Sequence, residues 1–288
     1  MTNVLPTTRT DNHSHNHHSH SHHSYNNYRL IAENITLAYQ ETLITEGLSL
    51  KIPDKQFTVI LGPNGCGKST LLRGLSKLLS PSKGQICFDG QNLEQYPRKA
   101  LAKVLGLLPQ SAIAPSGITV HDLVARGRFP HQSFMRRWTL ADEKAVNDAI
   151  QATQIEALLQ QTVESLSGGQ RQRVWVAMVL AQQTPYLLLD EPTTYLDIAH
   201  QIELLELFST LNRQDGRTIV AVLHDLNHAC RYADHLIVMK SGTVVAQGAP
   251  KDIMTETLVH DVYGLNSVVI DDPLTHTPLV IPKPLSKR

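Results

Sequence analysis

Apolar positions around residue 50 follow the spacing of β-strands. Leu48, Leu50 and Ile52 alternate with polar residues, and a period of two is typical of a strand with one buried face. Residues 57–61 (FTVIL) form a mostly apolar run that stops at Gly62. A run of this kind is typical of a strand that is buried on both faces of a sheet. The pattern therefore predicts one half-buried strand followed by one central strand.

Apolar residues at helical spacing follow this central strand. A helix is predicted over residues 68–79, because the Ser, Pro and Gly residues of 80–84 end it. Further along the chain, Thr119 and Thr139 each precede apolar residues at helical spacing, and Thr is a favoured N-cap residue. We therefore expect residues 115–160 to be mainly helical.

Two later apolar segments, residues 186–189 and 219–223, predict further buried strands. Strand and helix patterns thus alternate along the chain, and this order is typical of an α/β domain with a largely parallel core sheet. The mainly helical stretch is interpreted as an insert between two strands of that sheet. Ordered structure is expected to begin near Tyr28.

The first 27 residues differ in composition from the remainder of the chain. They contain histidines spaced by Ser and Asn, namely His13, His15, His17, His18, His20, His22 and His23. No apolar face can form in such a segment, so residues 1–27 are expected to be a disordered tail. Neutral imidazoles can capture Zn²⁺ or Ni²⁺ weakly. The alternative is a solvated tail without a role.

Composition and charge exclude several classes of protein. The 26 Lys and Arg residues balance the 26 Asp and Glu residues, which argues against a broad nucleic-acid-binding surface. Cys66, Cys87 and Cys230 show no pairing pattern, so a reducing compartment is the better interpretation. The sequence has no stretch of about 18 apolar residues and no signal-peptide pattern. We therefore expect a soluble chain that reaches a membrane only through a partner.

A phosphate-binding pattern begins where the strand 57–61 ends. The pattern G-x-x-x-x-G-K-[ST] is matched by Gly62, Pro63, Asn64, Gly65, Cys66, Gly67, Lys68 and Ser69, with Thr70 directly behind. The glycines allow backbone N–H groups to surround phosphate oxygens, and the N-terminus of the following helix adds partial positive charge. Lys68 is expected to reach the β- and γ-phosphates of ATP, and Ser69 is expected to hold Mg²⁺.

Two carboxylates follow the predicted strand 186–189. Asp190 and Glu191 lie at its carboxyl end, which is where open α/β sheets bind ligands. We expect Asp190 to help hold Mg²⁺ and Glu191 to polarise the attacking water as a general base. Together with the phosphate loop, these two residues predict a nucleotide hydrolase.

A third motif lies ahead of the acidic strand. In the segment LSGGQRQR, Ser167 is placed to cap a helix, and Gly168 and Gly169 allow backbone amides to approach an anion. With Gln170, this segment resembles the signature motif of the ABC ATPases, and the resemblance extends over residues 28–288. It implies a head-to-tail homodimer, in which each ATP lies between the phosphate loop of one chain and the signature motif of the other.

The resemblance also implies roles for residues outside these motifs. Tyr39 resembles the aromatic residue that stacks on adenine, and Gln110 resembles the glutamine that contacts Mg²⁺ or water and senses the helical insert. His224 resembles the switch histidine that contacts the γ-phosphate. Asp197 belongs to the dimer-contact loop, in which Tyr195 departs from the small residue often found there. The resemblance thus implies that Gln110 and His224 join the acidic pair at the catalytic centre.

An architecture and a set of partners follow from the same resemblance. It implies a RecA-like P-loop ATPase core with an antiparallel β lobe and a helical lobe inserted at about residues 112–165. Subunits of this family are peripheral proteins on the cytoplasmic face of the inner membrane. They dock onto integral-membrane permease subunits, to which a periplasmic or extracellular binding protein delivers the cargo. No nucleic-acid partner is expected.

Several stretches bear on the cargo. They resemble the importer branch for ferric siderophores, heme and vitamin B12, most closely the ferric-enterobactin-type uptake ATPases, and they cover residues 124–131, 221–232, 262–264, 271–273 and 278–282. We therefore expect uptake of a ferric siderophore. The histidine-rich tail favours an alternative, which is uptake of zinc or nickel. An ABC ATPase of ribosomes or DNA repair is a further alternative, but such proteins usually contain two cassettes or a long coiled coil.

Overall fold

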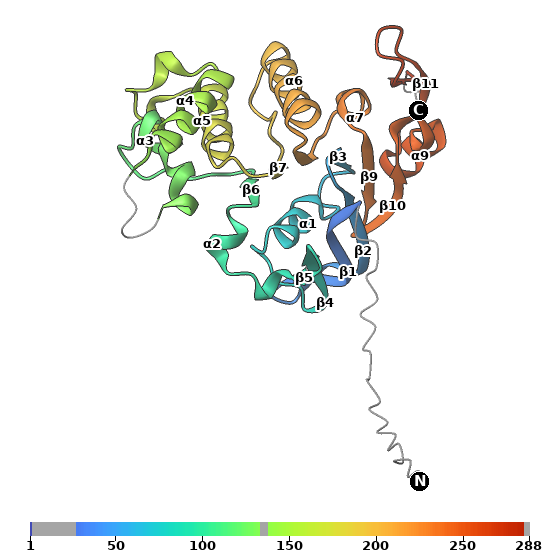
Figure 1. Cartoon of the computed structure of the whole chain (residues 1–288). Helices are drawn as coiled ribbons and strands as arrows, with labels where there is room; N and C mark the ends of the chain where they lie inside the picture. The colour runs from blue at the N-terminus through green and yellow to red at the C-terminus, as the bar shows by residue number, and fades with distance from the viewer. Residues whose placement is uncertain (2–26, 133–137, 285–288) are drawn as a thin grey trace.

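The computed structural model describes Met1 and residues 27–132 and 138–284. Figure 1 shows two sheets with a helix between them, a helical lobe beside the sheets and a group of C-terminal elements on the other side. The predicted tail, residues 1–27, lies almost wholly outside the described residues. Within the described ranges, no helix is long and apolar enough to cross a membrane.

The first sheet is antiparallel. Its strand order is β2-β1-β4-β5, with β1 at Tyr28–Tyr39, β2 at Thr42–Pro53, β4 at Lys83–Phe88 and β5 at Gln91–Asn92. The alternation predicted for the half-buried strand is confirmed, because Leu48, Leu50 and Ile52 of β2 are buried while the residues between them are exposed. This sheet is the antiparallel β lobe that the family resemblance implied.

The second sheet is the core sheet, with the strand order β10-β9-β3-β8-β7-β6. Its strands are β3 (Phe57–Leu61), β6 (Leu105–Leu108), β7 (Tyr186–Asp190), β8 (Thr218–Val222), β9 (His235–Lys240) and β10 (Thr243–Gly248). Neighbouring strands are parallel, apart from the antiparallel pair β9 and β10. Every residue of β3, β7 and β8 is buried. The predicted α/β domain with a largely parallel core sheet is confirmed.

Helix α1 (Lys68–Leu75) packs between the two sheets, in contact with β1 and β7. The prediction that this helix extends to residue 79 is wrong. Lys77 adopts a left-handed backbone conformation with φ of 61°, and the N–H groups of Leu78 and Leu79 both bond to the carbonyl of Arg73. This bonding closes the last turn, so the chain leaves the helix before the Ser-Pro segment that was expected to end it.

Side chains of the central strands enter two hydrophobic cores. Leu187 and Leu189 of β7 belong to the core that includes the helices after β6, whereas Leu188 belongs to the core shared with α1 and the antiparallel sheet. Strands that are covered on both faces need apolar residues at every position. This double burial explains the uninterrupted apolar runs, and it leaves the carboxyl ends of the strands as the place where polar side chains emerge.

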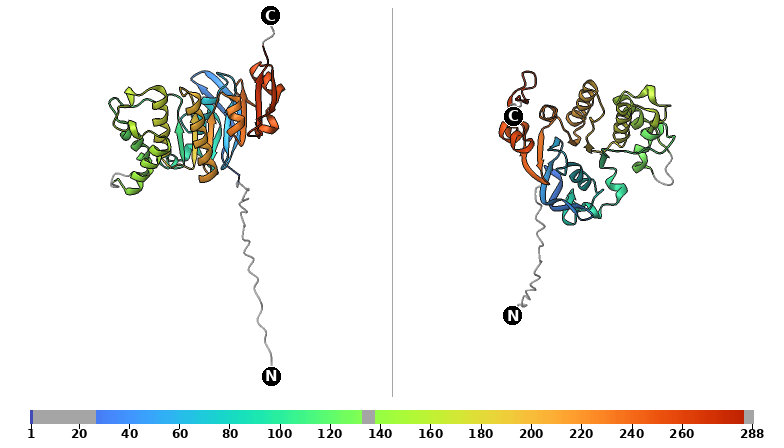
Figure 2. Two further views of the ribbon diagram at one scale, coloured as in Figure 1. Left: turned by 90° about the horizontal axis from the view of Figure 1, so that it is seen from above. Right: turned by 180° about the vertical axis from the view of Figure 1, so that it is seen from behind.

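The segment predicted to be mainly helical forms a lobe beside the core sheet. It contains α3 (Val120–Ala125), η2 (Arg126–His131), α4 (Leu140–Ala152) and η3 (Glu156–Leu158), and it packs against α5 (Gly168–Ala181), which follows η4 (Val163–Ser165). Both predicted N-caps are confirmed: Thr119 accepts a hydrogen bond from the N–H of Asp122, and Thr139 forms a capping box with Asp142. We call α3 to η3 the helical lobe; Figure 2 shows it at one end of the molecule.

A buried ion pair holds the helical lobe together. Arg128 Nε lies 2.9 Å from Asp142 Oδ1, and both side chains are buried. Arg128 also donates to the carbonyl oxygen of Ala181 at the end of α5, at 2.8 Å. The guanidinium group therefore joins η2, α4 and α5 through charge-assisted hydrogen bonds. Phe129, the next residue, is 71% exposed, so residues 124–131 have a packing side and a surface side.

The remaining elements surround the sheets. Between β5 and β6 lie η1 (Leu93–Gln95) and α2 (Arg98–Leu101). After β7 come α6 (Ile198–Asp215), α7 (Leu226–Tyr232), α8 (Pro250–Ile253) and α9 (Glu256–Tyr263), and then the antiparallel hairpin of β11 (Ser267–Asp271) and β12 (Pro278–Pro282). Figure 2 shows this C-terminal hairpin at the end of the molecule opposite the helical lobe. Strand β12 packs against α7.

Candidate functional site

The predicted phosphate loop joins β3 to α1. Gly65 and Gly67 have φ angles of 76° and 101°, a backbone conformation that favours glycine. A Cβ atom at Gly62 would lie 2.3 Å from the carbonyl oxygen of Met239, so no side chain fits there. Helix α1 begins at Lys68, directly after this loop. The unpaired N–H groups and partial positive charge of the helix N-terminus therefore lie at the loop, where they stabilise an anion.

Lys68 supplies the positive side chain of the loop. Its side chain is buried, with 5% exposed. Its Nζ donates to the carbonyl oxygens of Gly62 at 2.8 Å and Pro63 at 3.1 Å. Neutral carbonyl groups orient the ammonium group but do not cancel its charge. A buried ammonium group held in this way favours an anionic ligand beside it.

A hydroxyl and a carboxylate join α1 to the end of β7. Ser69 Oγ donates to Asp190 Oδ1 at 2.8 Å. Burial raises the pKa of Asp190, and the hydrogen bond from Ser69 opposes this shift. Hydroxyl and carboxylate oxygens are ligands that Mg²⁺ prefers, and a divalent cation would offset the cost of burying the carboxylate. The pair therefore fits the cation expected from the sequence.

Glu191, the next residue, has polar neighbours from three segments. His224 Nε2 lies 2.7 Å from Glu191 Oε1, Thr194 Oγ1 donates to Oε2 at 3.3 Å, and the Gln110 side chain also hydrogen-bonds to the carboxylate. Burial alone would raise the pKa of Glu191, but the hydrogen bonds from His224 and Gln110 outweigh it, and the pKa lies below its usual value. The carboxylate is therefore ionised at neutral pH, as a general base must be.

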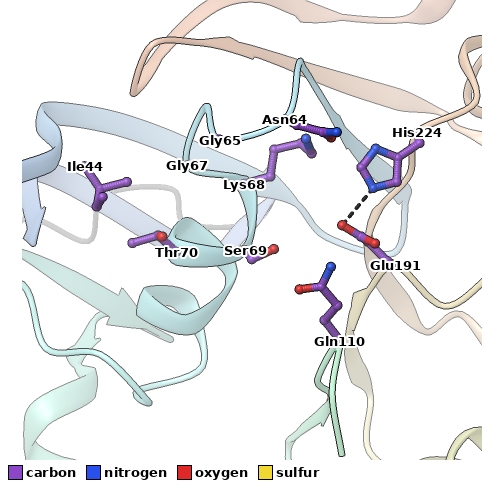
Figure 3. A pocket seen from close by; sticks show the side chains of 10 residues that line it. All are labelled: Ile44, Asn64, Gly65, Gly67, Lys68, Ser69, Thr70, Gln110, Glu191 and His224. Atoms are coloured by element: carbon purple, nitrogen blue, oxygen red, sulfur yellow. Dashed lines mark ion pairs between the residues drawn. The ribbon is translucent and has the colours of Figure 1, made fainter. Parts of the chain in front are cut away.

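Most of these residues line one cavity of about 690 Å³, shown in Figure 3, but Asp190 does not line it. Its lining residues are Ile44, Asn64, Gly65, Gly67, Lys68, Ser69, Thr70, Gln110, Glu191 and His224. The structure thus brings together five separate segments: β2, the phosphate loop with the start of α1, the chain two residues beyond β6, the residue after β7 and the chain two residues beyond β8. A cavity of this size is in the range of small-molecule and cofactor sites. The individual roles assigned from the sequence stay predictions.

Sequence reasoning missed Ile44 and expected Tyr39 instead. Ile44 belongs to β2, and its Cγ2 would lie 3.1 Å from a Cβ atom at Gly67. Tyr39, at the end of β1, does not line the cavity: it is 39% exposed and accepts a hydrogen bond from Arg73 Nη1 at 3.0 Å. The approach of β2 to the loop depends on how the two sheets pack, and no local pattern signals it. Stacking of Tyr39 on adenine stays a prediction.

The signature motif lies at the N-terminus of α5. The predicted N-cap is confirmed, because Ser167 Oγ accepts from the N–H of Gln170 at 3.3 Å and Gln170 Oε1 accepts from the N–H of Ser167 at 3.0 Å. Gly168 and Gly169 pack closely against the loop after β7. None of residues 167–170 lines the cavity at the phosphate loop. Within one chain, the signature motif and the phosphate loop are therefore separate.

The predicted dimer-contact loop lies beside the signature motif. Tyr195 has φ of 69° and is 75% exposed, and a Cβ atom at Gly168 would lie 3.3 Å from its Cβ. Asp197 caps α6 by accepting the N–H of His200 at 3.0 Å. A second cavity of about 280 Å³ lies between this loop, α5 and Gln110. Gln110 lines both cavities. It therefore connects the cavity at the phosphate loop with the cavity beside α5.

An anion-binding loop at the start of a helix and carboxylates at the ends of a parallel sheet define a class of protein, the P-loop nucleotide hydrolases. Comparisons with known proteins narrow this class. Residues 45–194 match the family model described as ABC transporter. The chain belongs to the ABC transporter family. It is the ATP-binding subunit of a transporter of this family, and it is an ATPase.

Two relatives and one solved structure illustrate the similarity. The chain is 57% identical over 254 residues to the ferric enterobactin transport ATP-binding protein FepC of Escherichia coli (strain K12), covering 88% of this chain and 94% of that protein. It is 48% identical over 253 residues to the achromobactin transport ATP-binding protein CbrD of Dickeya dadantii (strain 3937), with the same coverage. The dimeric ATP-binding cassette MJ0796 with ADP and Pi has a TM-score of 0.69 at 28% identity, covering 76% of this chain and 98% of that chain.

Proposed function

We propose that the chain is the ATP-hydrolysing subunit of an importer that takes up a ferric siderophore. The observation that carries this proposal is the 57% identity, over nearly the full length of both chains, to a protein named for ferric enterobactin transport. The identity of 48% to a protein named for achromobactin transport adds support. Uptake of zinc, nickel, heme or vitamin B12 is the alternative, and the histidine-rich segment that favours zinc or nickel lies outside the described residues.

In the proposed reaction, water attacks the γ-phosphate of ATP. Glu191 accepts a proton from the attacking water, since its carboxylate is ionised and lines the cavity. His224, 2.7 Å from Glu191, orients this carboxylate and contacts the γ-phosphate. Lys68 and the backbone of the loop hold the β- and γ-phosphates. Most of the catalysis then comes from positioning and from electrostatic stabilisation of the transferred group.

Three oxygen-bearing side chains are proposed to hold Mg²⁺. Ser69 Oγ lies 2.8 Å from Asp190 Oδ1. Gln110 lines the same cavity as Ser69. When bound, the cation neutralises charge on the phosphates. The protein contributes the arrangement of these ligands, because α1 carries Ser69 and the end of β7 carries Asp190. Thr70, Asn64 and the loop glycines complete the proposed nucleotide site.

Two copies of the chain are proposed to share two ATP molecules, head to tail. The signature residues Ser167, Gly168, Gly169 and Gln170 do not line the phosphate-loop cavity of their own chain. A capped helix N-terminus with closely approachable backbone amides is itself an anion site. When a partner chain packs head to tail, its signature motif lies over the nucleotide that the phosphate loop of the first chain holds. The dimeric state of the cassette MJ0796 with ADP and Pi supports the proposal.

Replacing Ser167 with arginine is expected to weaken ATP-dependent dimerisation at least about tenfold. The long arginine side chain would fill the space in which the signature motif of one chain contacts the γ-phosphate held by the other chain. ATP binding by the single chain should stay unchanged. The measurement is analytical ultracentrifugation with and without Mg·ATP. The matched control is Ser165→Arg, at an exposed position two residues earlier. A Ser167→Arg chain that dimerises like wild type would show that the signature motif does not act across an interface.

The proposed partners and location follow from the transporter role. We propose an ATPase domain at residues 28–288, with a helical subdomain at about 112–165 that docks onto integral-membrane permease subunits. The exposed Phe129 and the cavity beside Gln110 support contact on this side of the molecule. A periplasmic or extracellular binding protein would act through the permease. The chain would then be a peripheral protein on the cytoplasmic face of the inner membrane, without a nucleic-acid partner.

Uptake in cells tests the proposed cargo. Cells that lack the chain are expected to lose uptake of labelled ferric siderophore and to keep uptake of labelled zinc. Wild-type chain should restore uptake, whereas the Glu191→Gln chain should not, because transport needs hydrolysis. Loss of zinc uptake with iron uptake intact would contradict the siderophore proposal. Normal uptake of every tested cargo would favour a non-transport ABC ATPase.

A further inference from the structure

One asparagine joins α7 to the C-terminal hairpin. Asn227 lies in the first turn of α7, and its Oδ1 accepts the N–H of Val280 on β12 at 2.7 Å. Its Nδ2 donates to the carbonyl oxygen of the same residue at 3.3 Å. Strand β12 pairs with β11 in a two-stranded sheet, and the backbone groups on the free edge of a strand need partners. The Asn227 side chain supplies both partners for Val280, as a neighbouring strand would.

The hairpin that Asn227 contacts is part of the packed domain. Val280 is buried and belongs to the same hydrophobic core as Ala229 and Cys230 of α7. Strand β12 packs against α7, and β11 packs against α9. Figure 1 shows α7 beside these C-terminal elements. The hairpin is therefore a fixed support, to which Asn227 attaches α7.

Helix α7 begins two residues after His224. It has 7 residues, and a helix this short depends on tertiary contacts for its position. Its last turn is attached to α6, because the Tyr232 hydroxyl donates to Glu206 Oε1 at 2.9 Å. Asn227 provides the corresponding attachment of the first turn. This turn is the part of α7 that lies nearest to His224 in the chain.

The position of the His224 ring depends strongly on the backbone that carries it. The side chain is 44% exposed, so packing restrains it little, and its Nε2 lies 2.7 Å from Glu191 Oε1. On the strand side the backbone is fixed, since the N–H of Leu223 bonds to the carbonyl oxygen of Ile60 on β3. On the helix side it is fixed by the first turn of α7. A shift of this turn would therefore change the distance between the imidazole and the carboxylate.

We propose that Asn227 is a positioning residue for His224: it attaches the first turn of α7 to the C-terminal hairpin and so holds the imidazole beside the Glu191 carboxylate. This inference rests on the proposed reaction, in which His224 orients Glu191. It gives the hairpin a role in ATP hydrolysis, although no residue of β11 or β12 lines the cavity at the phosphate loop. Residues 221–232 and 278–282, which stood out in the sequence only by resemblance, thereby gain a physical connection.

Asn227→Leu tests the proposal, because leucine has a similar size and forms neither hydrogen bond. We expect the kcat of ATP hydrolysis to fall about tenfold, since misplacement by about 1 Å can cost up to about 10²-fold. The Kd for Mg·ATP should stay within about twofold of wild type, because the phosphate loop is untouched. Rates are measured well below the Tm of each variant, so that unfolding does not contribute. The milder Asn227→Asp keeps the acceptor for the Val280 N–H, and its kcat should lie between the two.

The same change in a His224→Ala chain tests whether Asn227 acts through His224. If it does, Asn227→Leu should lower kcat no further once the imidazole is gone, because residues that act as a unit have non-additive effects. A merely structural role of Asn227 would not produce this result. Losses of kcat that multiply in the double variant would overturn the proposal.

Asn212→Leu is the matched control. Asn212 is also buried, and it also makes two hydrogen bonds to the backbone, to the carbonyl oxygens of Lys55 at 3.0 Å and Arg217 at 2.7 Å. Lys55 and Arg217 precede β3 and β8, whereas His224 lies beyond the carboxyl end of β8. This variant should lose Tm and keep the wild-type kcat.

Two results with these single variants would overturn the proposal: a wild-type kcat in Asn227→Leu, or an equal loss of kcat in Asn212→Leu. Failure of the proposed function would look different. A wild-type chain that hydrolyses no ATP, or a His224→Ala chain with unchanged kcat, would contradict the proposed reaction itself. The two failures are therefore distinguishable.

Discussion

Glu191→Gln is expected to lower the kcat of ATP hydrolysis by about 10²-fold to 10⁴-fold, which is the usual contribution of a general base. Glutamine keeps the size and hydrogen-bonding capacity of the side chain but cannot accept the proton of the attacking water. The phosphate loop, Lys68 and Ser69 are untouched, so the Kd for Mg·ATP should stay within about threefold of wild type. Phosphate release at saturating ATP measures the first quantity, and titration with a fluorescent ATP analogue measures the second.

Glu156→Gln provides the control for this experiment. Glu156 lies on η3 in the helical lobe and is exposed, so the same chemical change there should leave both quantities at the wild-type value. Near-normal turnover in Glu191→Gln would show that another group accepts the proton. A loss of ATP affinity with kcat unchanged would show that Glu191 serves binding rather than the chemical step.

Lys68→Ala is expected to raise the Kd for Mg·ATP on the order of 100-fold. Lys68 is buried, and its ammonium group donates to the carbonyl oxygens of Gly62 and Pro63 in the loop. Hydrogen bonds from a charged donor to phosphate contribute about 1.5–3 kcal/mol, and about 3 kcal/mol corresponds to roughly 100-fold in Kd. The effect should be larger for ATP than for AMP, because AMP lacks the β- and γ-phosphates. Isothermal titration calorimetry with both nucleotides gives this comparison.

Lys144→Ala is the matched control, since Lys144 forms an exposed pair with Asp148 on α4 and such pairs contribute little. Its ATP affinity should equal that of wild type. A Lys68→Ala chain with unchanged ATP affinity would contradict the assignment of the phosphate loop. A loss that is equal for ATP and AMP would place the effect on the folding of the loop rather than on the phosphates.

The sequence predicted features that depend on residues close together in the chain. The phosphate loop is contiguous, its flanking strand is apolar throughout, and Ser167, Thr119 and Thr139 act on the N–H groups of the helices that follow them. The core sheet was predictable as well, since strands buried on both faces carry apolar residues at every position. Asp190 and Glu191 then had to lie at its carboxyl edge.

Features that depend on packing between distant segments were not predictable in this way. The early end of α1 follows from the left-handed conformation of Lys77, which carries no strong local signal for a lysine. Ile44 reaches the cavity because β2 of one sheet lies near the loop at the end of the other. Such contacts are set by tertiary structure, which overrides local propensity.

The molar mass of the Glu191→Gln chain in Mg·ATP is the most direct test of the central claim, that two copies enclose ATP between phosphate loop and signature motif. The single chain has a mass of 32.0 kDa. Light scattering should show a doubling of this mass when Mg·ATP is added, with one bound nucleotide per chain, and no doubling with Mg·ADP. A mass that stays at the single-chain value while ATP is bound would contradict the account.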